Sequence, residues 1–293
     1  MNGAFLIECV TWHYICIKTS IKYMKKIEEV ANLNNKKVLL RLDLNVPLKN
    51  NEITDSTRID KILPTLRFLI QKNSRIIIIS HIGRPEGKID KKLSMLPVCK
   101  YLSQKLNEQV ELIEKQIFDI EPNIIFKNSK HRILFLENIR FYEQEEKNNE
   151  GFAKLLSGFG DVYINDAFSC SHRAHASIDK ITKFIPSYCG IQMHNEVNAL
   201  KKVTSDIKRP ITCIIGGSKI STKINLIKNL IPKFENLVIV GGMANNILKY
   251  KGFNIGNSIN EKNCDKVVSK IFSLSEENNC NLVFPSDVAV GKK

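Results

Sequence analysis

The eight cysteines of this 293-residue chain form no CxxC pair and show no other spacing typical of a zinc site. Several lie inside apolar runs, as Cys213 does in the run Ile211–Ile215. A cysteine in such a run usually acts as a small, buried hydrophobic residue. The lack of a disulfide or zinc framework therefore favours a reducing, cytoplasmic location over secretion.

The chain also lacks a block of lysines and arginines, although its formal net charge is +14. Its lysines are scattered over predicted helix faces, and it has only one tryptophan. A nucleic-acid site would combine clustered basic residues with aromatic ones, so a solvated basic surface explains the charge better. We expect neither nucleic acid nor a membrane as a partner.

Residues 1–23 are apolar, but Glu8 and His13 interrupt them. The apolar part is too short for a transmembrane helix, and it lacks the basic start and cleavage site of a signal peptide. The sequence from Met24 onward is typical of a natural start before a first strand. We therefore expect residues 1–23 to be an extension outside the fold.

Arginine is scarce, because only nine of the 44 basic residues are Arg. Five of these nine end or follow predicted strands: Arg41, Arg58, Arg84, Arg140 and Arg173. The planar guanidinium is a bidentate donor for carboxylate and phosphate, and the carboxyl edge of a parallel sheet is where α/β folds bind ligands. The arginines thus predict a site for a small, highly anionic substrate.

The order of apolar and amphipathic segments predicts the fold class. Several short runs are nearly all Ile, Val and Leu, as in Ile76–Ile79, which is typical of parallel strands covered on both faces. Strands are expected at Val38–Asn45, Arg75–Ser80, Val110–Ile113, Ile133–Leu136, Asp161–Asn165, Ile211–Ile215, Leu237–Val240 and Leu282–Phe284. Helices are expected at Arg58–Gln71, Leu93–Leu106, Gly151–Leu156, Met193–Val203, Ile220–Leu230, Met243–Tyr250 and Lys262–Leu274. This alternation predicts an α/β fold of doubly wound, Rossmann-like parallel sheets.

A change of pattern near residues 186–210 predicts two domains. Pro186 ends one segment, a single helix follows, and Lys208-Arg209-Pro210 opens a new strand. We expect an α/β domain at 24–188, a hinge-bearing linker helix at 189–207 and a second α/β domain at 208–293. Only three strands are expected in the second domain, so its sheet is expected to be incomplete.

Four polar clusters follow strands of the expected first domain, at Arg41–Pro47, His81–Pro85, Phe135–Phe141 and Tyr163–Ser177. In each, an apolar strand gives way abruptly to charged or amide side chains. Buried polar groups need partners, so a ligand site is one interpretation and a strand-end turn is the other.

The last cluster carries His172 and His175 at a spacing of i, i+3, which would suit a metal ion if a third ligand followed. No third ligand stands at a useful spacing, and Arg173 lies between the two histidines. We therefore expect an anion-binding loop here and no metal site.

Two glycine turns follow strands of the expected second domain. Gly216 and Gly217 precede Lys219 and Lys223, and the pair Gly241-Gly242 repeats the pattern. The P-loop motif GxxxxGK[ST] is absent, and glycines after strands are common. A strand, a glycine turn and a helix start would still place backbone N–H groups and Lys219 where they favour a phosphate.

Together these motifs resemble the phosphoglycerate kinase family. The resemblance starts near Met24 and runs through RLDLNVP, ITDSTRI, HIGRP, FLENIRF, YINDAFSCSHRAHAS, GGSKISTK, GGMANNIL and FPSDVAV. It implies two α/β domains, one for the triose and one for the adenine nucleotide. It also implies reversible phosphoryl transfer between 1,3-bisphosphoglycerate and ADP, with Mg²⁺, in glycolysis or gluconeogenesis, by a cytoplasmic monomer.

The resemblance also implies roles for particular residues. The 3-phosphoglycerate part would be held by Asp43, Asn45, Arg58, His81, Arg84, Arg140 and Arg173. The nucleotide phosphates would contact Lys219 and Lys223 beside Gly216, Gly217, Gly241 and Gly242. Arg58 and Lys219 would stabilise the phosphoryl group in flight.

Some of the family's features are missing from the sequence. These are the glycine-rich GGGD-type turn with the metal-site Asp, the acidic ribose-binding segment and the final helix. Cys170 also stands where a small or hydroxyl residue is common in the family. A fragment that binds phosphoglycerate without transferring phosphate is therefore the alternative expectation.

Overall fold

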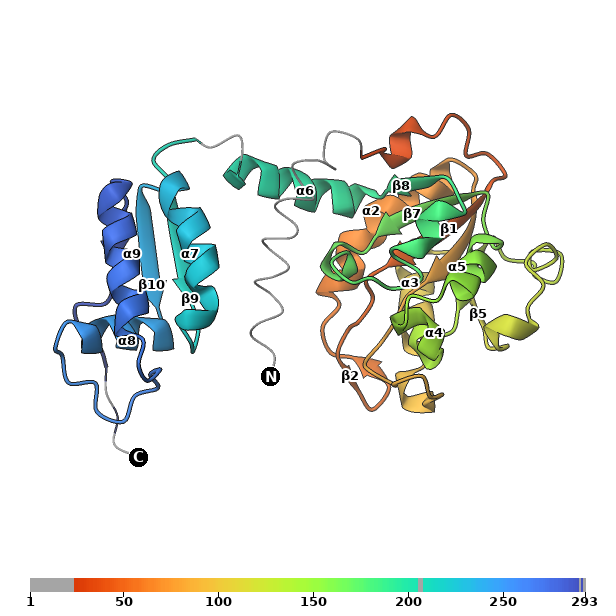
Figure 1. The fold of residues 1–293 in the computed structure, drawn as a ribbon. Coiled ribbons are helices and arrows are strands. Elements are labelled where there is room, and N and C mark those ends of the chain that lie inside the picture. Colours follow the sequence, from red (N-terminus) through yellow and green to blue (C-terminus); the bar gives the residue numbers. More distant parts are fainter. Residues whose placement is uncertain (1–23, 205–207, 290, 292–293) are drawn as a thin grey trace. The chain divides into compact units, whose positions relative to one another are not determined.

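The computed structural model describes residues 24–204, 208–289 and 291 (Figure 1). The expected extension 1–23 lies outside them. The described chain forms two compact units that divide between Asn198 and Ala199. Within these residues, no helix is both long and apolar enough to cross a membrane.

The first unit is built on a parallel six-stranded sheet with the order β5-β6-β4-β1-β7-β8. Its strands are β1 (Lys37–Leu42), β4 (Arg75–Ile79), β5 (Val110–Ile113), β6 (Ile133–Leu136), β7 (Val162–Asp166) and β8 (Ser187–Cys189). A small antiparallel hairpin of β2 (Leu48–Lys49) and β3 (Glu52–Ile53) follows β1. The predicted α/β class and the five predicted strands of this unit are confirmed.

Both faces of this sheet are covered, as the runs of Ile and Leu predict. Successive side chains of a strand point to opposite faces. On β1, Leu40 and Leu42 pack with one apolar cluster, whereas Leu39 packs with the other. The first cluster includes Leu66 of one helix, and the second includes Phe152 of another.

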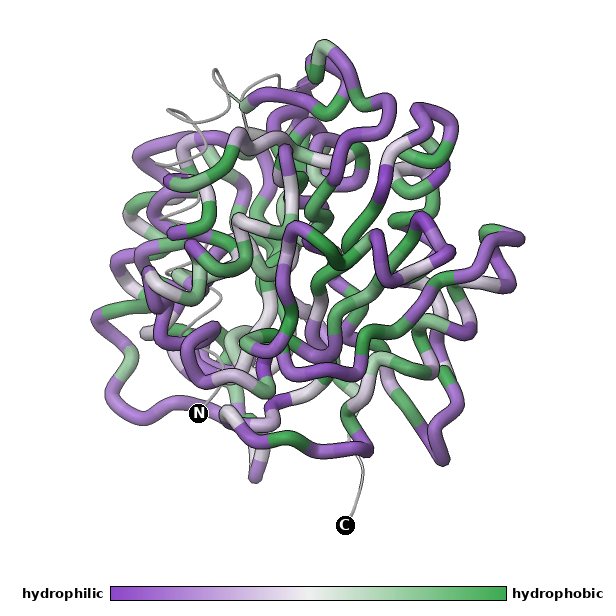
Figure 2. Tube along the Cα trace, turned by 90° about the vertical axis from the view of Figure 1, so that its right-hand side faces the viewer, coloured by the Kyte–Doolittle hydropathy of each residue, from purple (hydrophilic) through white to green (hydrophobic). Residues whose placement is uncertain are grey.

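The helices of the first unit are α2 (Thr57–Gln71), α3 (Leu96–Leu106), α4 (Glu143–Glu146), α5 (Glu150–Ser157) and the start of α6 (Ile191–Thr204). The helices α2 and α3 cover one face of the sheet, and α5 covers the other. Short 3₁₀ turns lie at Ile27–Glu29, Lys91–Leu93, Ile117–Asp119, Ile139–Phe141, Phe168–Cys170 and Lys180–Lys183. Figure 2 shows helical turns in which apolar and hydrophilic residues alternate, as expected for helices with one face against a sheet.

The second unit contains a parallel three-stranded sheet with the order β11-β10-β9. Its strands are β9 (Thr212–Gly216), β10 (Asn236–Val240) and β11 (Asn281–Val283), and its helices are α7 (Ile224–Leu230), α8 (Gly242–Tyr250) and α9 (Asp265–Glu277). Further 3₁₀ turns lie at Ser221–Lys223 and Ile231–Lys233. Leu237 and Ile239 are fully buried, whereas Ile214 is 69% exposed. Among the described residues, this sheet is therefore covered on one face only.

The start of α7 differs from the sequence expectation. A helix was expected from Ile220, but the glycine turn leads into the 3₁₀ turn Ser221–Lys223, and α7 begins at Ile224. Lys219 therefore lies in the loop and not at an α-helix N-terminus, so the expected helix-end phosphate site is wrong in this detail. The second glycine pair does open directly into a helix, because Gly242 is the first residue of α8.

All six described cysteines are free thiols, as expected: Cys99, Cys170, Cys189, Cys213, Cys264 and Cys280. Five of them are buried, and burial raises the pKa of Cys189 to about 11. The division into a first domain at 24–188, a linker helix at 189–207 and a second domain at 208–293 stays a proposal. The helix α6 lies within the proposed linker.

Asp166, at the carboxyl end of β7, fixes the start of α6. Its side chain accepts hydrogen bonds from the Met193 N–H at 2.7 Å and from the Thr65 hydroxyl at 2.5 Å. Gly190 lies so close that a Cβ added there would be 2.3 Å from the Asp166 carboxyl carbon. Asp166 is 1% exposed, and burial raises its pKa to about 6.

This raised pKa predicts a pH-dependent stability. The folded state binds the Asp166 proton more tightly than the unfolded chain, so this group stabilises the fold at low pH and less as pH rises from about 4 to 6. In Asp166→Asn that titration is absent. From pH 4 to pH 7, the free energy of unfolding should shift in favour of the variant, relative to wild type, by about 3 kcal/mol. Urea unfolding at each pH measures this shift.

The control is Asn123→Ala, because Asn123 is exposed in the same unit and its side chain does not titrate. Its difference from wild type should stay constant over this pH range. A constant difference for Asp166→Asn as well would contradict the assigned role of the buried carboxyl.

Candidate functional site

The topology of the first sheet selects one place for a ligand. The strand β1 pairs with β4 on one side and with β7 on the other. After β1 the chain places β4, β5 and β6 on one side of β1, and then places β7 and β8 on the opposite side. Ligands of such folds bind at the carboxyl ends of the strands where this reversal occurs. The polar clusters after β1, β4 and β7 lie there.

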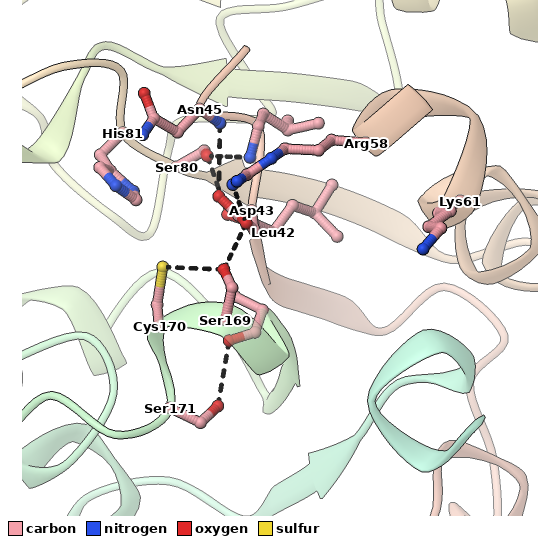
Figure 3. A network of polar contacts seen from close by, with 12 residues as sticks. Leu42, Asp43, Asn45, Arg58, Lys61, Ser80, His81, Ser169, Cys170 and Ser171 are labelled. Carbon is pink, nitrogen blue, oxygen red and sulfur yellow. Dashed lines mark hydrogen bonds and ion pairs between the residues drawn. The ribbon is translucent and has the colours of Figure 1, made fainter. Parts of the chain in front are cut away.

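Asp43, just after β1, organises one part of this edge (Figure 3). Its Oδ2 accepts a hydrogen bond from Arg58 Nη1 at 2.5 Å and another from the Ser169 hydroxyl. Arg58 lies in the first turn of α2, and its side chain is 49% exposed. Asp43 therefore holds an accessible guanidinium at the edge of the sheet without burying it.

Asn45 joins the β1 and β4 loops. Its side-chain oxygen accepts the Gly83 N–H at 2.9 Å. Gly83 has φ +64°, and a Cβ there would meet the Leu93 side chain at 2.9 Å, so the turn requires glycine. This turn follows His81, which is 3% exposed, and precedes Arg84, which is exposed.

Arg140 is a buried cation of this edge with unsatisfied donors. The residue is 2% exposed, and only its Nη1 donates to a backbone carbonyl, that of Gly83 at 2.9 Å. Its Nε lies 3.3 Å from Glu146, yet neither Nε nor Nη2 makes a hydrogen bond in the described structure. Burial and the neighbouring Arg173 lower the pKa of Arg140. A buried guanidinium with unused donors is suited to an anionic ligand.

Arg41 differs from the other four arginines of the sequence prediction. It is 1% exposed, on β1 itself, and its donors contact Ser177, the Leu42 carbonyl and His81. The sequence grouped it with the ligand arginines, but the structure uses its donors inside the protein. Because β1 is a central strand with both faces covered, a side chain that does not point into solvent at the strand end becomes buried.

The loop after β7 carries the remaining charged groups. Arg173 is half-buried and His172 is exposed. His175 lies 3.8 Å from Glu145, but burial and the arginines 140, 173 and 41 lower the pKa of His175 to about 4. His175 is therefore neutral at pH 7, and this approach is not an ion pair. Burial and the same arginines also lower the pKa of His81.

Asp43, His81 and Cys170 bring three metal-ligand atom types within 4.8 Å of one another. Asp43 Oδ2 and His81 Nδ1 already accept hydrogen bonds. Asp43 accepts from Arg58 and Ser169, and His81 accepts from Arg41 at 3.0 Å. The surrounding arginines also repel a cation. We therefore do not assign a metal site to this group.

A pocket of about 180 Å³ opens beside the Asp43–Arg58 pair and is also lined by Lys61, Asp166 and Ser169. Its size suits a small metabolite and not a polymer. Sequence reasoning missed Ser169 and Lys61 here. The only signal for Ser169 was its place in the Ser169–Ser171 segment after a strand, and Lys61 had none among the many surface lysines.

In the second unit the two glycine turns lie against each other. Gly217 accepts the Met243 N–H at 2.8 Å, and a Cβ on Gly242 would be 3.2 Å from the Gly217 carbonyl oxygen. Lys223 lies near Gly217, and burial lowers the pKa of Lys223. Lys219 is exposed. The structure thus brings Gly216, Gly217, Gly241, Gly242 and Lys223 together, with Lys219 on the adjoining loop.

Glu261 closes the other side of this loop. Its carboxylate accepts the N–H of Ser221 at 3.0 Å and the Ser221 hydroxyl. Burial would raise its pKa, but these hydrogen bonds and the charge of Lys219 outweigh burial and lower it. Sequence reasoning missed Glu261, because it lies 40 residues from Ser221 and in no motif.

Comparison with known proteins gives the same family throughout. The family model for phosphoglycerate kinase matches residues 27–293. The phosphoglycerate kinase of Wolbachia sp. subsp. Brugia malayi is 44% identical over 262 residues, which are 89% of this chain and 65% of that protein. The solved structure of phosphoglycerate kinase from Coxiella burnetii superimposes with a TM-score of 0.80 at 36% identity, over 89% of this chain and 66% of that one.

A more distant structure, phosphoglycerate kinase from Pyrococcus horikoshii OT3, has a TM-score of 0.72 at 27% identity. The chain spans about two thirds of the length of the curated relatives it matches. The family match extends over both units, from the first 3₁₀ turn to the end of the chain. With the strand order and the arginine-rich sheet edge, this shows that the chain belongs to the phosphoglycerate kinase family.

Proposed function

We propose that this protein catalyses reversible phosphoryl transfer between 1,3-bisphosphoglycerate and ADP, as a glycolytic kinase. The first unit binds the triose and the second binds the adenine nucleotide. The observation that carries this proposal is Arg140, a buried guanidinium with two donors that no described residue satisfies. Phosphate and carboxylate groups match such donors, and 3-phosphoglycerate carries both.

The proposed triose site uses the residues at the carboxyl edge of the first sheet: Asp43, Asn45, Arg58, His81, Arg84, Arg140 and Arg173. Buried Arg140 and half-buried Arg173 neutralise the anion, and exposed Arg84 adds charge at the rim. Asp43 positions Arg58, whose guanidinium it accepts a hydrogen bond from, and Asn45 positions the turn at Gly83, whose N–H it accepts. Uncharged His81 contributes a neutral hydrogen-bonding group among these cations.

The transfer step needs positioning and charge stabilisation more than covalent chemistry. In the direction of ATP synthesis, an ADP β-phosphate oxygen attacks the acyl phosphorus. The bond to the carboxyl oxygen breaks, and 3-phosphoglycerate leaves as a carboxylate. No general base is required, because the ADP oxygen is already ionised. Arg58, held by Asp43 yet half-exposed, stabilises the charge on the transferred group, and Lys219 does the same for the nucleotide phosphates.

Mg²⁺ is proposed only as part of the bound Mg·nucleotide. Magnesium sites in proteins usually combine one or two carboxylates with phosphate oxygens. Glu261 holds the loop after the first glycine turn, and both its oxygens already accept hydrogen bonds from Ser221. Glu261 is therefore not proposed as a magnesium ligand. We also propose that the protein is a cytoplasmic monomer.

Arg140→Gln tests the triose site directly. The variant removes a buried cation with unused donors, so it should unfold at the same or a higher temperature than wild type without ligand. At 3-phosphoglycerate of about 100 times Kd, the melting temperature of wild type should rise by roughly 5 °C. The variant should lose most of that rise. Differential scanning fluorimetry measures both effects.

The control is Arg75→Gln, since Arg75 is exposed at the opposite, amino end of β4. It should keep the full ligand-induced rise. An undiminished rise in Arg140→Gln would remove Arg140 from the site.

Arg58→Ala should leave the fold intact, because the side chain is half-exposed, and should lower the turnover number by at least about 10³-fold. A coupled assay of ADP formation from ATP and 3-phosphoglycerate measures this. Arg67→Ala, an exposed arginine on the same helix, should turn over like wild type. Retained turnover in Arg58→Ala would refute its assigned role.

Lys219→Ala should lower turnover and nucleotide affinity while 3-phosphoglycerate affinity, measured by calorimetry, stays unchanged. The physical reason is that Lys219 belongs to the second unit, near Glu261 and the glycine turns. Lys228→Ala, an exposed lysine on α7, is the matched control. Equal losses of both affinities in Lys219→Ala would argue against a separate site for each substrate.

The alternative, a phosphoglycerate-binding protein without transfer, rests on the same first-unit site. It predicts that 3-phosphoglycerate binds, that Mg·ADP does not, and that the coupled assay shows no turnover. Transfer of phosphate by the 293-residue chain would exclude this alternative.

A further inference from the structure

Among the described residues of the first unit, Glu145 is, like Asp166, a buried carboxylate that the mechanism above does not use. It lies on α4, between the exposed residues Glu143 and Glu146, and its own exposure is 0%. Burial raises the pKa of Glu145, against the charges of Arg41 and Arg140 and the hydrogen bonds from Ser177, which lower it. A buried carboxylate is costly unless it is well paired, so its partners indicate what it does.

The two hydrogen bonds that the carboxylate accepts both come from Ser177, in the loop after β7. The Ser177 hydroxyl donates to Glu145 Oε1 at 2.6 Å, and the Ser177 N–H donates to Oε2 at 2.9 Å. The Ala176 N–H donates to the Glu145 backbone carbonyl at 2.9 Å. Glu145 thus fastens the end of the loop that carries Arg173.

Ser177 passes this constraint to Arg41. Its hydroxyl donates to Glu145 and accepts from Arg41 Nε at 3.1 Å, which uses both capacities of a hydroxyl. Tyr163 donates to the Ser177 carbonyl at 2.5 Å, so the serine is held on its backbone as well. Ser177 and Tyr163 are nearly inaccessible to solvent, at 0% and 1% exposure.

Arg41 in turn sets the state of His81. Its Nη2 lies 3.0 Å from His81 Nδ1. A guanidinium is always a donor, so Nδ1 must accept, and the neutral ring carries its proton on Nε2. Burial and the charges of Arg41, Arg140 and Arg173 lower the pKa of His81, which keeps the ring neutral.

We propose that Glu145 is a positioning residue of the triose site, acting through Ser177 and Arg41 to fix the tautomer of His81 and the loop that carries Arg173. This inference rests on the proposed function for its ligand. The Glu145 carboxyl also lies close to the buried cations Arg41 and Arg140, whose charges oppose the burial that raises its pKa. Without this carboxyl, the Ser177 hydroxyl loses its acceptor, and the buried cations Arg41 and Arg140 lose their acidic neighbour.

The test compares Ser177→Ala, Glu145→Gln and Ser177→Thr in the full 293-residue chain. In the first two, 3-phosphoglycerate should bind at least about tenfold more weakly by calorimetry, because the supporting contacts are lost. Ser177→Thr keeps the hydroxyl and should restore binding. Glu143→Gln, the same change on an exposed residue of α4, should bind like wild type.

A second readout separates positioning from mere stability. Nitrogen-15 NMR of the histidine rings, with His81 assigned by its loss in His81→Asn, should show one neutral tautomer in ligand-free wild type. In Ser177→Ala the two His81 nitrogen shifts should move toward a mixture of tautomers. Unchanged His81 shifts would overturn the proposal even if binding falls, and unchanged binding would overturn it even if the shifts move.

This readout is independent of the proposed function. If wild type fails to bind 3-phosphoglycerate while its His81 ring shows the expected single tautomer, the substrate assignment fails and the hydrogen-bond chain stands. If wild type binds 3-phosphoglycerate and His81 is a tautomer mixture, the positioning role fails and the substrate assignment stands.

Discussion

The burial of two guanidinium groups, Arg41 and Arg140, constrains the whole carboxyl edge of the first sheet. Their exposures are 1% and 2%. A guanidinium keeps its charge inside a protein, so its surroundings must supply acceptors or negative charge. Arg41 obtains them from Ser177, Leu42 and, indirectly, Glu145. Arg140 obtains only the Gly83 carbonyl and a nearby Glu146, which leaves it ready for an anion.

The two arginines therefore divide the work of the site. Each of the three guanidinium nitrogens of Arg41 donates within the protein and so holds the surrounding loops in place. Arg140 keeps two nitrogens without a hydrogen-bond partner. The same division appears around Asp43, whose acceptors are filled by Arg58 and Ser169 while the guanidinium of Arg58 stays accessible. A site built in this way is preorganised for a small polyanion, because folding has already brought the positive charges together against their mutual repulsion. Neutral His81 and His175 avoid adding to that cost.

Much of the fold was predictable from the sequence. The apolar runs of β5 and β6 gave the bounds that the structure has, and the α/β class followed from their alternation with helices. The three-residue β8 and the hairpin β2–β3 were missed, because segments this short carry no periodicity. The helix expected at Ile220 starts at Ile224, since the polar Ser221–Lys223 segment forms a 3₁₀ turn instead. The sequence also predicted coverage on both faces of the strands, which holds for the first sheet and not for the described part of the second.

The site was predictable as a set of charged clusters, but not as a set of contacts. The place of Arg58 and Arg140 at one edge follows from parallel topology alone. The inward direction of Arg41 does not, because it depends on which face of β1 each residue occupies. The sequence could not single out Glu145 among the acidic residues of Glu143–Glu146. Its burial depends on hydrogen bonds from Ser177, which is 32 residues away in the chain.

The most direct test of this account is calorimetric titration of the 293-residue chain with 3-phosphoglycerate. The account predicts binding at one site per chain, weakened by salt as expected for a ligand held by several arginines. A folded chain that releases no heat of binding and shows no saturation at millimolar 3-phosphoglycerate would contradict it, because the unused donors of Arg140 would then serve some other anion or none.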